Sequence, residues 1–348
     1  MKKVVVGMSG GVDSSVAAYL LKEQGYEVMG LFMKNWEEKN AEGICQSTQD
    51  YEDALRVCQA LDIPLYTVNF VQEYWDRVFS QFVEDLKCGY TPNPDVLCNK
   101  EIKFDVFFEK AKTLGADFLA TGHYCRTDGK NLLKGLDPNK DQSYFLYAVD
   151  RAVFPQVLFP VGELEKPQVR SIAKKLNLAT HAKKDSTGIC FIGKRNFKEF
   201  ISQYIPYHPG DFENTNGKII GRHDGAAYYT PGQRKGLGIG GPGEAWFVVD
   251  KDVKRNVVLI EQGEDHPALY ASELTAKEPT FLPETLPYKC KAKIRYRQED
   301  QPCTILLANE SEIHVQFDEP QRAITPHQSI VFYDGDICLG GALIQRSF

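Results

Sequence analysis

A short apolar stretch, a glycine-rich turn and a helical pattern follow one another at the start of the chain, and this succession narrows the possible folds. Val4-Val5-Val6-Gly7-Met8 has the apolar character of a buried strand, and Ser9-Gly10-Gly11-Val12-Asp13-Ser14-Ser15 forms the turn. Apolar residues then recur at helical spacing as far as Leu21, and Gly25 is placed to end the helix. A strand that passes through a glycine turn into a helix offers backbone N–H groups and the positive end of the helix dipole to an anion. The stretch therefore predicts a phosphate-binding loop in an α/β fold.

The turn differs from the two most familiar phosphate-binding motifs. It has neither the lysine of the P-loop nor the spaced glycines of the dinucleotide fingerprint. It resembles instead the loop of the ATP pyrophosphatases, which cut ATP between its α- and β-phosphates and transfer AMP to an oxygen atom. A glycine turn that only joins a strand to a helix is the alternative, and the length of the match makes it the weaker one. The resemblance implies that ATP, with Mg²⁺ on its phosphates and no metal site built from protein ligands alone, binds Gly7, Met8, Ser9, Gly10, Gly11, Val12, Asp13 and Ser14.

Strand and helix patterns alternate through the N-terminal third of the chain. We expect strands at 27–34, 65–70 and 118–121, with helices at 50–61 and 100–114. This alternation predicts a doubly wound parallel sheet, in which ligands bind at the carboxyl ends of the strands. Met33 and Gly122 follow two such strand ends, so we expect Met33 at the adenine and Gly122 close to the nucleotide.

The composition changes after about residue 205, where helical periodicity ends. Short strands separated by turns such as Asn216-Gly217 follow, and from about residue 271 the expected elements are all short strands at regular spacing. Such spacing is typical of a small β-barrel. We therefore predict an α/β catalytic domain at 1–204, a small β-rich central domain that binds RNA at 205–270, and a C-terminal β-barrel domain at 271–348.

Two of the nine cysteines stand in unusual surroundings. Cys98 follows a proline-stiffened stretch near the start of a predicted helix, and a helix N-terminus favours the thiolate. Cys190 lies in a loop between small polar residues and glycines, as suits an accessible thiol. From the residues alone, a structural and a reactive role are equally supported for both. Burial in the core is the expectation for the remaining Cys45, Cys58, Cys88, Cys125, Cys290, Cys303 and Cys338.

A predicted strand at 288–297 has an unusual charge pattern. Lysine or arginine alternates along it with uncharged residues, so that one face of the strand would carry five cations and no acid. A solvated strand face is the ordinary explanation of alternating charge. The absence of acids favours phosphate binding instead.

Motifs spread over most of the chain resemble the bacterial tRNA-specific 2-thiouridylase family, which places sulfur on C2 of the anticodon wobble uridine. They comprise 7–14, 93–99, 120–124, 140–144, 185–193, 230–237 and 294–296. The C-terminal region matches less well, since Thr325-Pro326-His327-Gln328 stands where the family has Thr-Pro-Gly-Gln. A histidine in place of that glycine could alter the turn on which Gln328 lies.

The resemblance implies a mechanism and a set of roles. AMP is transferred from ATP to O2 of the uridine, and sulfur carried by Cys190 as a persulfide then replaces it. Cys98 forms a disulfide with Cys190 or releases hydrosulfide, and Asp95 assists proton transfer. The sulfur comes from a carrier protein or a cysteine desulfurase, and the expected substrates are the lysine, glutamate and glutamine tRNAs. The tRNA contacts implied are Asn93, Pro94, Asp95, His123, Lys140, Asp141, Gln142, Arg295, Tyr296 and Gln328.

Bulk properties set the outer limits. The formal net charge of −6 argues against a globally basic surface for nucleic acid, although it leaves room for local patches. No apolar run is long enough for a transmembrane helix, and the chain passes from Met1 almost directly into a strand. We expect a cytoplasmic monomer without a membrane segment.

Three alternatives stay open at this point. Another ATP pyrophosphatase, such as a small-molecule amidotransferase or ligase, would not need the two cysteines. A non-catalytic RNA-binding protein that uses the β-barrel would not need the nucleotide loop. An iron–sulfur cluster held by Asp95, Cys98 and Cys190 is also conceivable, but no Cys-x-x-Cys pair is present to support it.

Overall fold

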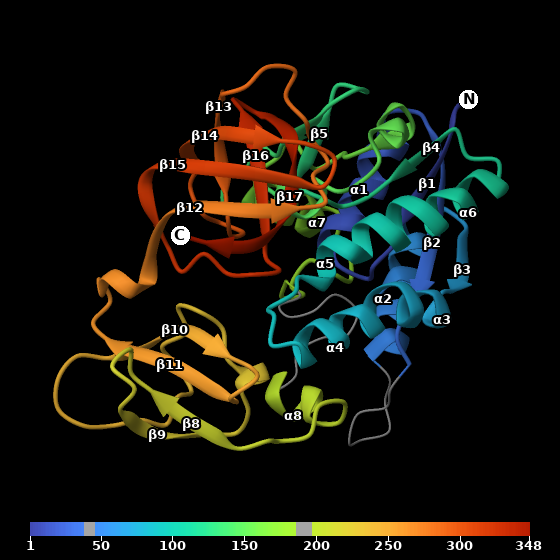
Figure 1. Ribbon diagram of the computed structural model, residues 1–348. Coiled ribbons are helices and arrows are strands. Elements are labelled where there is room, and N and C mark those ends of the chain that lie inside the picture. The colour runs from blue at the N-terminus through green and yellow to red at the C-terminus, as the bar shows by residue number, and fades with distance from the viewer. Residues whose placement is uncertain (38–45, 186–196) are drawn as a thin grey trace. The chain divides into compact units, whose positions relative to one another are not determined.

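The computed structural model describes residues 1–37, 46–185 and 197–348, and the chain divides into two compact units (Figure 1). The first unit comprises Met1–Phe79, Pro94–Lys194 and Asp334–Leu339, and the second comprises Ser80–Asn93, Arg195–Tyr333 and Gly340–Phe348. Cys45 and Cys190 lie outside the described residues.

A five-stranded parallel sheet forms the centre of the first unit, in the order β3-β2-β1-β4-β7. Its strands are β1 (Lys3–Gly7), β2 (Glu27–Lys34), β3 (Leu65–Asn69), β4 (Phe118–Ala120) and β7 (Val157–Leu158). The helices are α1 (Val12–Glu23), α2 (Gln46–Ala60), α3 (Val71–Tyr74), α5 (Pro94–Leu97), α6 (Phe107–Thr113) and α7 (Lys166–Lys175), with π-helical η1 (Trp75–Phe79) and η2 (Cys98–Val106) and 3₁₀-helical η3 (Ser143–Phe145) and η4 (Arg151–Gln156). A hairpin of β5 (Cys125–Thr127) and β6 (Leu132–Lys134) pairs with Ile337 and Cys338 of the same unit.

Helices cover both faces of this sheet, which confirms the predicted doubly wound fold. Val4 and Val6, which point to one face of β1, share a buried core with residues of α1, α2 and α7. Gly7 follows the same two-residue alternation as Val5 on the other face, and a Cβ built on it would lie 3.3 Å from Cε1 of Phe107 in α6. That close approach explains why glycine stands at the end of β1.

The predicted strand and helix boundaries agree closely near the loop and less well further on. β2 spans the predicted range, and α1 ends at Gly25 in a left-handed conformation with φ +83. The N–H of Tyr26 donates to the carbonyl of Leu21 at 3.2 Å, which closes the Schellman type of helix end. The helix expected at 100–114 begins earlier, at Pro94, because proline is favoured at the first helical position.

The second unit holds two β structures. The first is a four-stranded sheet in the order β10-β11-β8-β9, made of β8 (Gly210–Glu213), β9 (Ile219–His223), β10 (Trp246–Asp252) and β11 (Val257–Gln262). The second is a barrel of β12 (Tyr270–Lys277), β13 (Tyr288–Lys293), β14 (Gln301–Ala308), β15 (Glu312–Arg322), β16 (Ser329–Asp334) and β17 (Ile337–Ser347). Pairing between β12 and β17 closes the barrel, as the sequence predicted. The remaining elements are α4 (Ser80–Lys87), α8 (Phe197–Ser202), η5 (Ala226–Tyr228) and η6 (Pro267–Leu269).

The basic strand expected at 288–297 is shorter than predicted. The prediction that it has one continuous cationic face is wrong. β13 ends at Lys293, whose Nζ lies 3.6 Å from a carboxylate oxygen of Asp300. The chain then turns, because the side chain of Gln298 accepts a hydrogen bond from the N–H of Ile294 at 2.8 Å. Beyond the turn Arg297 has φ +67, so the alternation that aligned the five cations does not continue.

Within the described residues, the structure contains no helix with the length and apolar character needed to cross a membrane.

Candidate functional site

The predicted loop lies where a doubly wound sheet binds its ligands. Strands β2 and β4 flank β1, so the strand order reverses at the point where the chain leaves β1. The loop Ser9–Ser14 follows β1, and Thr121-Gly122 follows β4 directly. Crevices at such a reversal, outside the carboxyl ends of the strands, are the usual ligand sites of this architecture.

Two glycines shape the loop through close approaches to neighbouring backbone. Gly10 has φ +70, and a Cβ built on it would lie 2.2 Å from the carbonyl oxygen of Asp50. A Cβ at Gly122 would lie 2.7 Å from the backbone nitrogen of Ser14. Gly122 therefore packs against the start of α1, and any larger side chain there would push the loop itself.

The serines of the loop divide into two groups. The hydroxyls of Ser9 and Ser14 lie 3.1 Å apart, and the N–H of Ser9 donates to Ser14 Oγ at 3.2 Å. Ser15 is fully buried, donates to the carbonyl of Gly11 at 2.7 Å and accepts from Thr180 at 3.0 Å. Ser15 thus holds the loop together, whereas the exposed Ser9 is available to a ligand.

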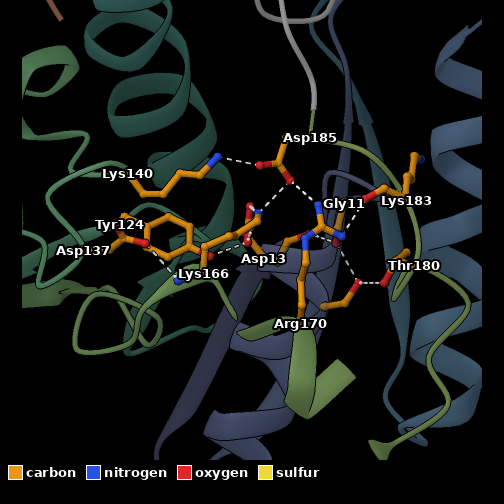
Figure 2. A network of polar contacts seen from close by, with 12 residues as sticks. Gly11, Asp13, Tyr124, Asp137, Lys140, Lys166, Arg170, Thr180, Lys183 and Asp185 are labelled. Carbon is orange, nitrogen blue, oxygen red and sulfur yellow. Dashed lines mark hydrogen bonds and ion pairs between the residues drawn. The ribbon is translucent and has the colours of Figure 1, made fainter. Parts of the chain in front are cut away.

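A network of charged side chains surrounds the loop (Figure 2). Nζ of Lys166 donates to both carboxylate oxygens of Asp13, at 2.7 and 2.8 Å, and lies 2.9 Å from Oδ1 of Asp185. The hydroxyl of Tyr124 also donates to Asp13, at 2.7 Å. Burial, with the negative charge of Asp13 added, raises the pKa of Tyr124, so this hydroxyl remains a donor. Asp13 is therefore held by two donors before any ligand arrives.

Three cations contact the carboxylate of Asp185. Nζ of Lys140 donates to its Oδ2 at 2.6 Å, and Nη2 of Arg170 donates to its Oδ1 at 2.6 Å, beside Lys166. Burial alone would raise the pKa of Asp185, but hydrogen bonds from Lys140 and Lys166 outweigh it and lower the pKa to about 2. The carboxylate is thus ionised at any physiological pH.

A further lysine ties the loop to α2. Nζ of Lys183 donates to the carbonyl of Gly10 at 2.9 Å and to carboxylates of Asp50 and Asp53 at 2.8 and 2.6 Å. Burial opposes the charge on Lys183, yet the two aspartates outweigh it and raise the pKa. The sequence reasoning did not single out Lys166, Arg170 or Lys183, because nothing local marks them. Their signal is only that they follow the last strand of the sheet.

The proposed reactive cysteine Cys98 is fully buried in the helical stretch that begins at Pro94. It is not at the helix N-terminus, as the sequence suggested, but one turn inside, while Asp95 lies in the first turn. The π-helical segment η2 starts at Cys98, and such irregular segments frequently mark functional sites. Its predicted partner Cys190 lies outside the described residues, so their pairing stays a prediction.

Two buried amides near these elements have unsatisfied atoms. Asn35, two positions beyond Met33 at the end of β2, is 1% exposed, and neither its Oδ1 nor its Nδ2 has a partner among the described residues. Asn99 donates from Nδ2 to the carbonyl of Phe145 at 3.0 Å, while its Oδ1 has none. An unsatisfied buried amide costs about 1–3 kcal/mol, so both are candidate ligand contacts that the sequence reasoning missed.

Four of the cysteines expected in the core, Cys58, Cys125, Cys303 and Cys338, are buried, whereas Cys290 is only half-buried, which corrects the expectation for it. Burial raises the pKa of Cys58 to about 11, and Cys303 is 2% exposed, with its Sγ 3.7 Å from Sγ of Cys290. Cys125 and Cys338 are buried as well. Cys88 is exposed, which corrects the expectation, because it follows the last residue of α4 at the surface.

The tRNA contacts expected in the first unit are placed unequally. His123 is 8% exposed, its Nδ1 lies 2.8 Å from the hydroxyl of Thr121, and burial holds its pKa well below the usual range. Asp141 is also buried and accepts hydrogen bonds from Ser143 and from the N–H of Gly135. Gln142 accepts from the N–H of Tyr124 at 3.0 Å. These residues are engaged in the fold around the loop, and their contact with tRNA stays a prediction.

The expected contacts in the second unit are likewise engaged. Nη2 of Arg295 donates to the carbonyls of Pro231 and Ala323 at 3.0 and 2.8 Å and to the hydroxyl of Thr325 at 2.9 Å. The neighbouring Tyr296 carries the guanidinium of Arg297 at 5.4 Å from its ring centre.

The turn with the unexpected histidine keeps a glycine-like backbone. His327 has φ +63, its ring stacks on Tyr90 at 3.6 Å, and its Nδ1 lies 3.3 Å from Oδ2 of Asp85. Gln328 donates to the carbonyl of Thr91, in the segment that leads to Asn93. The turn thus has a left-handed φ that glycine adopts readily, while an altered turn relative to the family's motif stays a prediction.

A parallel sheet with an anion-binding loop at its strand reversal defines a nucleotide-binding α/β domain, here joined to a β-rich region and a closed barrel. Family comparison agrees with this division. Residues 2–194 match the "tRNA methyl transferase HUP domain", 198–262 the "tRNA methyl transferase PRC-barrel domain" and 271–344 the "Aminomethyltransferase beta-barrel domain".

Full-length relatives identify the family more closely. The chain is 61% identical to "tRNA-specific 2-thiouridylase MnmA" of Protochlamydia amoebophila, over 99% of this chain and 94% of that relative. It is 54% identical to the protein of that name from Lysinibacillus sphaericus, over 99% and 95%, and 56% identical to that of Listeria monocytogenes, over 98% and 94%. The chain belongs to the tRNA-specific 2-thiouridylase family, as the sequence motifs predicted.

Proposed function

We propose that this protein replaces O2 of the anticodon wobble uridine of tRNA by sulfur, at the expense of ATP. The observation that carries the proposal is the loop Ser9–Ser14, open to an anion at the strand reversal and surrounded by Lys166, Arg170 and Lys183. An ATP-dependent step explains why a thiolase needs such a loop, because a uracil oxygen is a poor leaving group until AMP is attached to it.

Magnesium fits this site as a companion of ATP rather than as a resident ion. Among the residues that the structure describes, no group of three or more histidine, cysteine, aspartate or glutamate side chains could hold a metal. Mg²⁺ commonly binds through one or two carboxylates together with substrate phosphates. Asp13 would supply that carboxylate and the hydroxyls of Ser9 or Ser14 further oxygens. When bound, the ion would neutralise charge on the departing pyrophosphate.

The sulfur step follows from the two cysteines. A sulfur carrier or cysteine desulfurase converts the thiol of Cys190 to a persulfide. The thiolate of Cys98 attacks the inner sulfur, which forms a Cys98–Cys190 disulfide and releases hydrosulfide. Hydrosulfide adds to C2 of the adenylated uridine, and AMP leaves with the former oxygen. In the alternative order, the persulfide's terminal sulfur attacks C2 first and Cys98 then releases it. An external thiol must reduce the disulfide before the next cycle.

The tRNA would be bound by both units, with the target base splayed from its loop. We propose Asn93, Pro94 and Asp95 at the base and Asp95 as the proton-transfer group. The lysine, glutamate and glutamine tRNAs are the proposed substrates. The proposed domains are 1–204, 205–270 and 271–348, acting as a monomer in the cytoplasm. Further proposed tRNA contacts are His123, Lys140, Asp141, Gln142, Arg295, Tyr296 and Gln328, and the proposed ATP contacts beside the loop are Met33 and Gly122.

The decisive experiment is nucleoside analysis of unmodified glutamate tRNA after incubation with the protein, ATP, Mg²⁺ and a cysteine desulfurase with cysteine as the persulfide donor. Cys98→Ala and Cys190→Ser are compared with wild type, and Cys88→Ser serves as the control because Cys88 is exposed on α4's end and outside the proposed machinery. We expect 2-thiouridine from wild type and the control only.

Two other outcomes would change the proposal. AMP without thiouridine would keep the nucleotide site and overturn the substrate. Activity of Cys190→Ser with free sulfide would make Cys190 a carrier only, leaving the chemistry to Cys98 and Asp95. If neither AMP nor thiouridine forms in the presence of tRNA, the proposed function is wrong.

A further inference from the structure

The cations beside the loop come from one face of α7. Lys166 and Arg170 are four residues apart, so both side chains project from the same side of the helix. The backbone N–H of Lys166 donates to the buried carboxylate of Asp137 at 3.0 Å, and a capping box formed by Glu165 and Gln168 fixes the helix start. The position of this cationic face is therefore set by the fold and not by a ligand.

The Lys166 ammonium is surrounded by carboxylates. It has contacts to Asp13 at 2.7 and 2.8 Å and to Asp185 at 2.9 Å, and only 10% of its side chain is exposed. An ammonium has three donors, and two carboxylates already lie within contact distance of this one. A phosphate at the loop can therefore bind Lys166 only by displacing one of these two carboxylates.

Of the two carboxylates, Asp185 is the one that contacts several cations. It contacts Lys140, Lys166 and Arg170, and about a third of its side chain is exposed, which leaves it accessible to exchange. Three cations converge on the single carboxylate of Asp185, so an incoming anion would compete with this carboxylate for the same cations (Figure 2). Asp13, by contrast, belongs to the loop itself.

We propose that Asp185 is an internal competitor of ATP, which occupies the Lys166–Arg170 pair in the nucleotide-free protein and yields it to the phosphates when ATP binds. This inference rests on the proposed function and adds to it the residues that bind the phosphates and a built-in limit on affinity. The exchange replaces one anion by another at the same two cations, so it needs no cation from elsewhere.

Competition makes a distinctive prediction, because removing a competitor strengthens binding whereas removing a structural residue weakens it. We would measure MgATP binding by isothermal titration calorimetry without tRNA, so that no turnover occurs. Asp185→Asn keeps the size and hydrogen-bonding capacity of the side chain, and we expect it to bind MgATP about tenfold more tightly than wild type. Lys166→Met and Arg170→Met should bind at least about tenfold more weakly.

The control is Asp105→Asn. Asp105 also forms an ion pair with an arginine, Arg77, at 2.7 Å, but both side chains are exposed and the pair lies outside the network. It should leave the affinity unchanged. Urea unfolding of each variant shows which ones fold, and Asp185→Ser provides a second variant should Asp185→Asn fail to do so.

The possible results separate this inference from the function on which it rests. If folded Asp185→Asn and Asp185→Ser bind MgATP no more tightly than wild type, the competition is refuted while ATP binding stands. If wild type binds no MgATP, the proposed function itself is wrong. Retained affinity in both Lys166→Met and Arg170→Met would overturn the assignment of the phosphate cations.

Discussion

Replacement of Gly10 by alanine tests the geometry of the loop most directly. Gly10 has φ +70, a conformation that costs an L-residue about 1–2 kcal/mol. The new Cβ would lie 2.2 Å from the carbonyl oxygen of Asp50, whereas ordinary contacts begin at 3.4 Å. Because the obstacle is backbone of α2 and not a flexible side chain, relief requires the loop to move. Overpacking of this kind costs about 1–3 kcal/mol, so we expect a total loss of about 2–5 kcal/mol in the free energy of unfolding.

Gly25→Ala is the matched control. Gly25 has a comparable φ of +83 at the end of α1, but nothing lies within 4 Å of a Cβ built there. It should show the backbone cost alone, about 1–2 kcal/mol. The difference between the two variants in urea unfolding therefore measures the contact with Asp50.

Nucleotide binding should separate the two variants further. Displacement of the loop misaligns the N–H groups that would face the phosphates, and one hydrogen bond to a charged group contributes about 1.5–3 kcal/mol. We expect Gly10→Ala to bind MgATP at least about tenfold more weakly than wild type, and Gly25→Ala to bind it normally. Equal affinity of Gly10→Ala and wild type would refute the idea that this loop conformation binds the phosphates.

Three further changes have defined outcomes. Arg295→Met removes hydrogen bonds to two carbonyls and to Thr325, so we expect about 2–3 kcal/mol less stability in urea unfolding; no loss would leave Arg295 a role in tRNA contact alone. His327→Gly relieves about 1 kcal/mol of backbone strain but loses the contact with Asp85 and the stack on Tyr90, which is worth about 0.5–1.5 kcal/mol. Thermal denaturation should therefore show a net loss of stability of no more than about 1 kcal/mol. A clear gain in stability would contradict this compensation. The pKa of Asp185 is lowered from 3.8 to about 2, so its stabilising contribution is complete above pH 3.8 and is lost as the pH falls through about 2. The difference in unfolding free energy between wild type and Asp185→Asn should be constant from neutral pH down to pH 3.8 and shrink below it; a difference that grows on acidification would contradict this sign.

Local patterns were enough to predict the strands, the loop and the barrel. The loop needs only a strand, two glycines and a helix in immediate succession, and Gly25 ends that helix as the sequence indicated. Strand β2 could be located because its residues are buried in one continuous run. Such features depend on neighbours in the sequence, which is why single-sequence reasoning reaches them.

The charged network could not be predicted for the opposite reason. Asp13 is separated from Lys166 by 153 positions, and no spacing rule connects it with Lys166 or Asp185. The same limitation explains the error over the basic strand. Alternation predicted a shared face, but the turn after Ile294 depends on the side chain of Gln298, and Arg295 is drawn to carbonyls that its own strand does not contain. A charge pattern in the sequence shows which residues need an oppositely charged or hydrogen-bonding partner, but the tertiary structure determines which partner each one contacts.

The turn at His327 shows how a bulky side chain can be accommodated at a backbone conformation that favours glycine. A glycine adopts a positive φ at little cost, whereas histidine must be compensated. The ring of His327 lies nearly parallel to that of Tyr90, with an angle of 5° between the planes, and it lies beside Asp85. Burial alone would raise the pKa of Asp85, but the contact with His327 outweighs it and lowers the pKa. The contacts with Tyr90 and Asp85 therefore offset the cost of a positive φ at His327, a cost that a glycine would not have. Since the N–H of His327 and the carbonyl of Gln328 both pair with Ile344, the strand register that places Gln328 is retained, and the substitution gives no reason to exclude Gln328 from contact with tRNA.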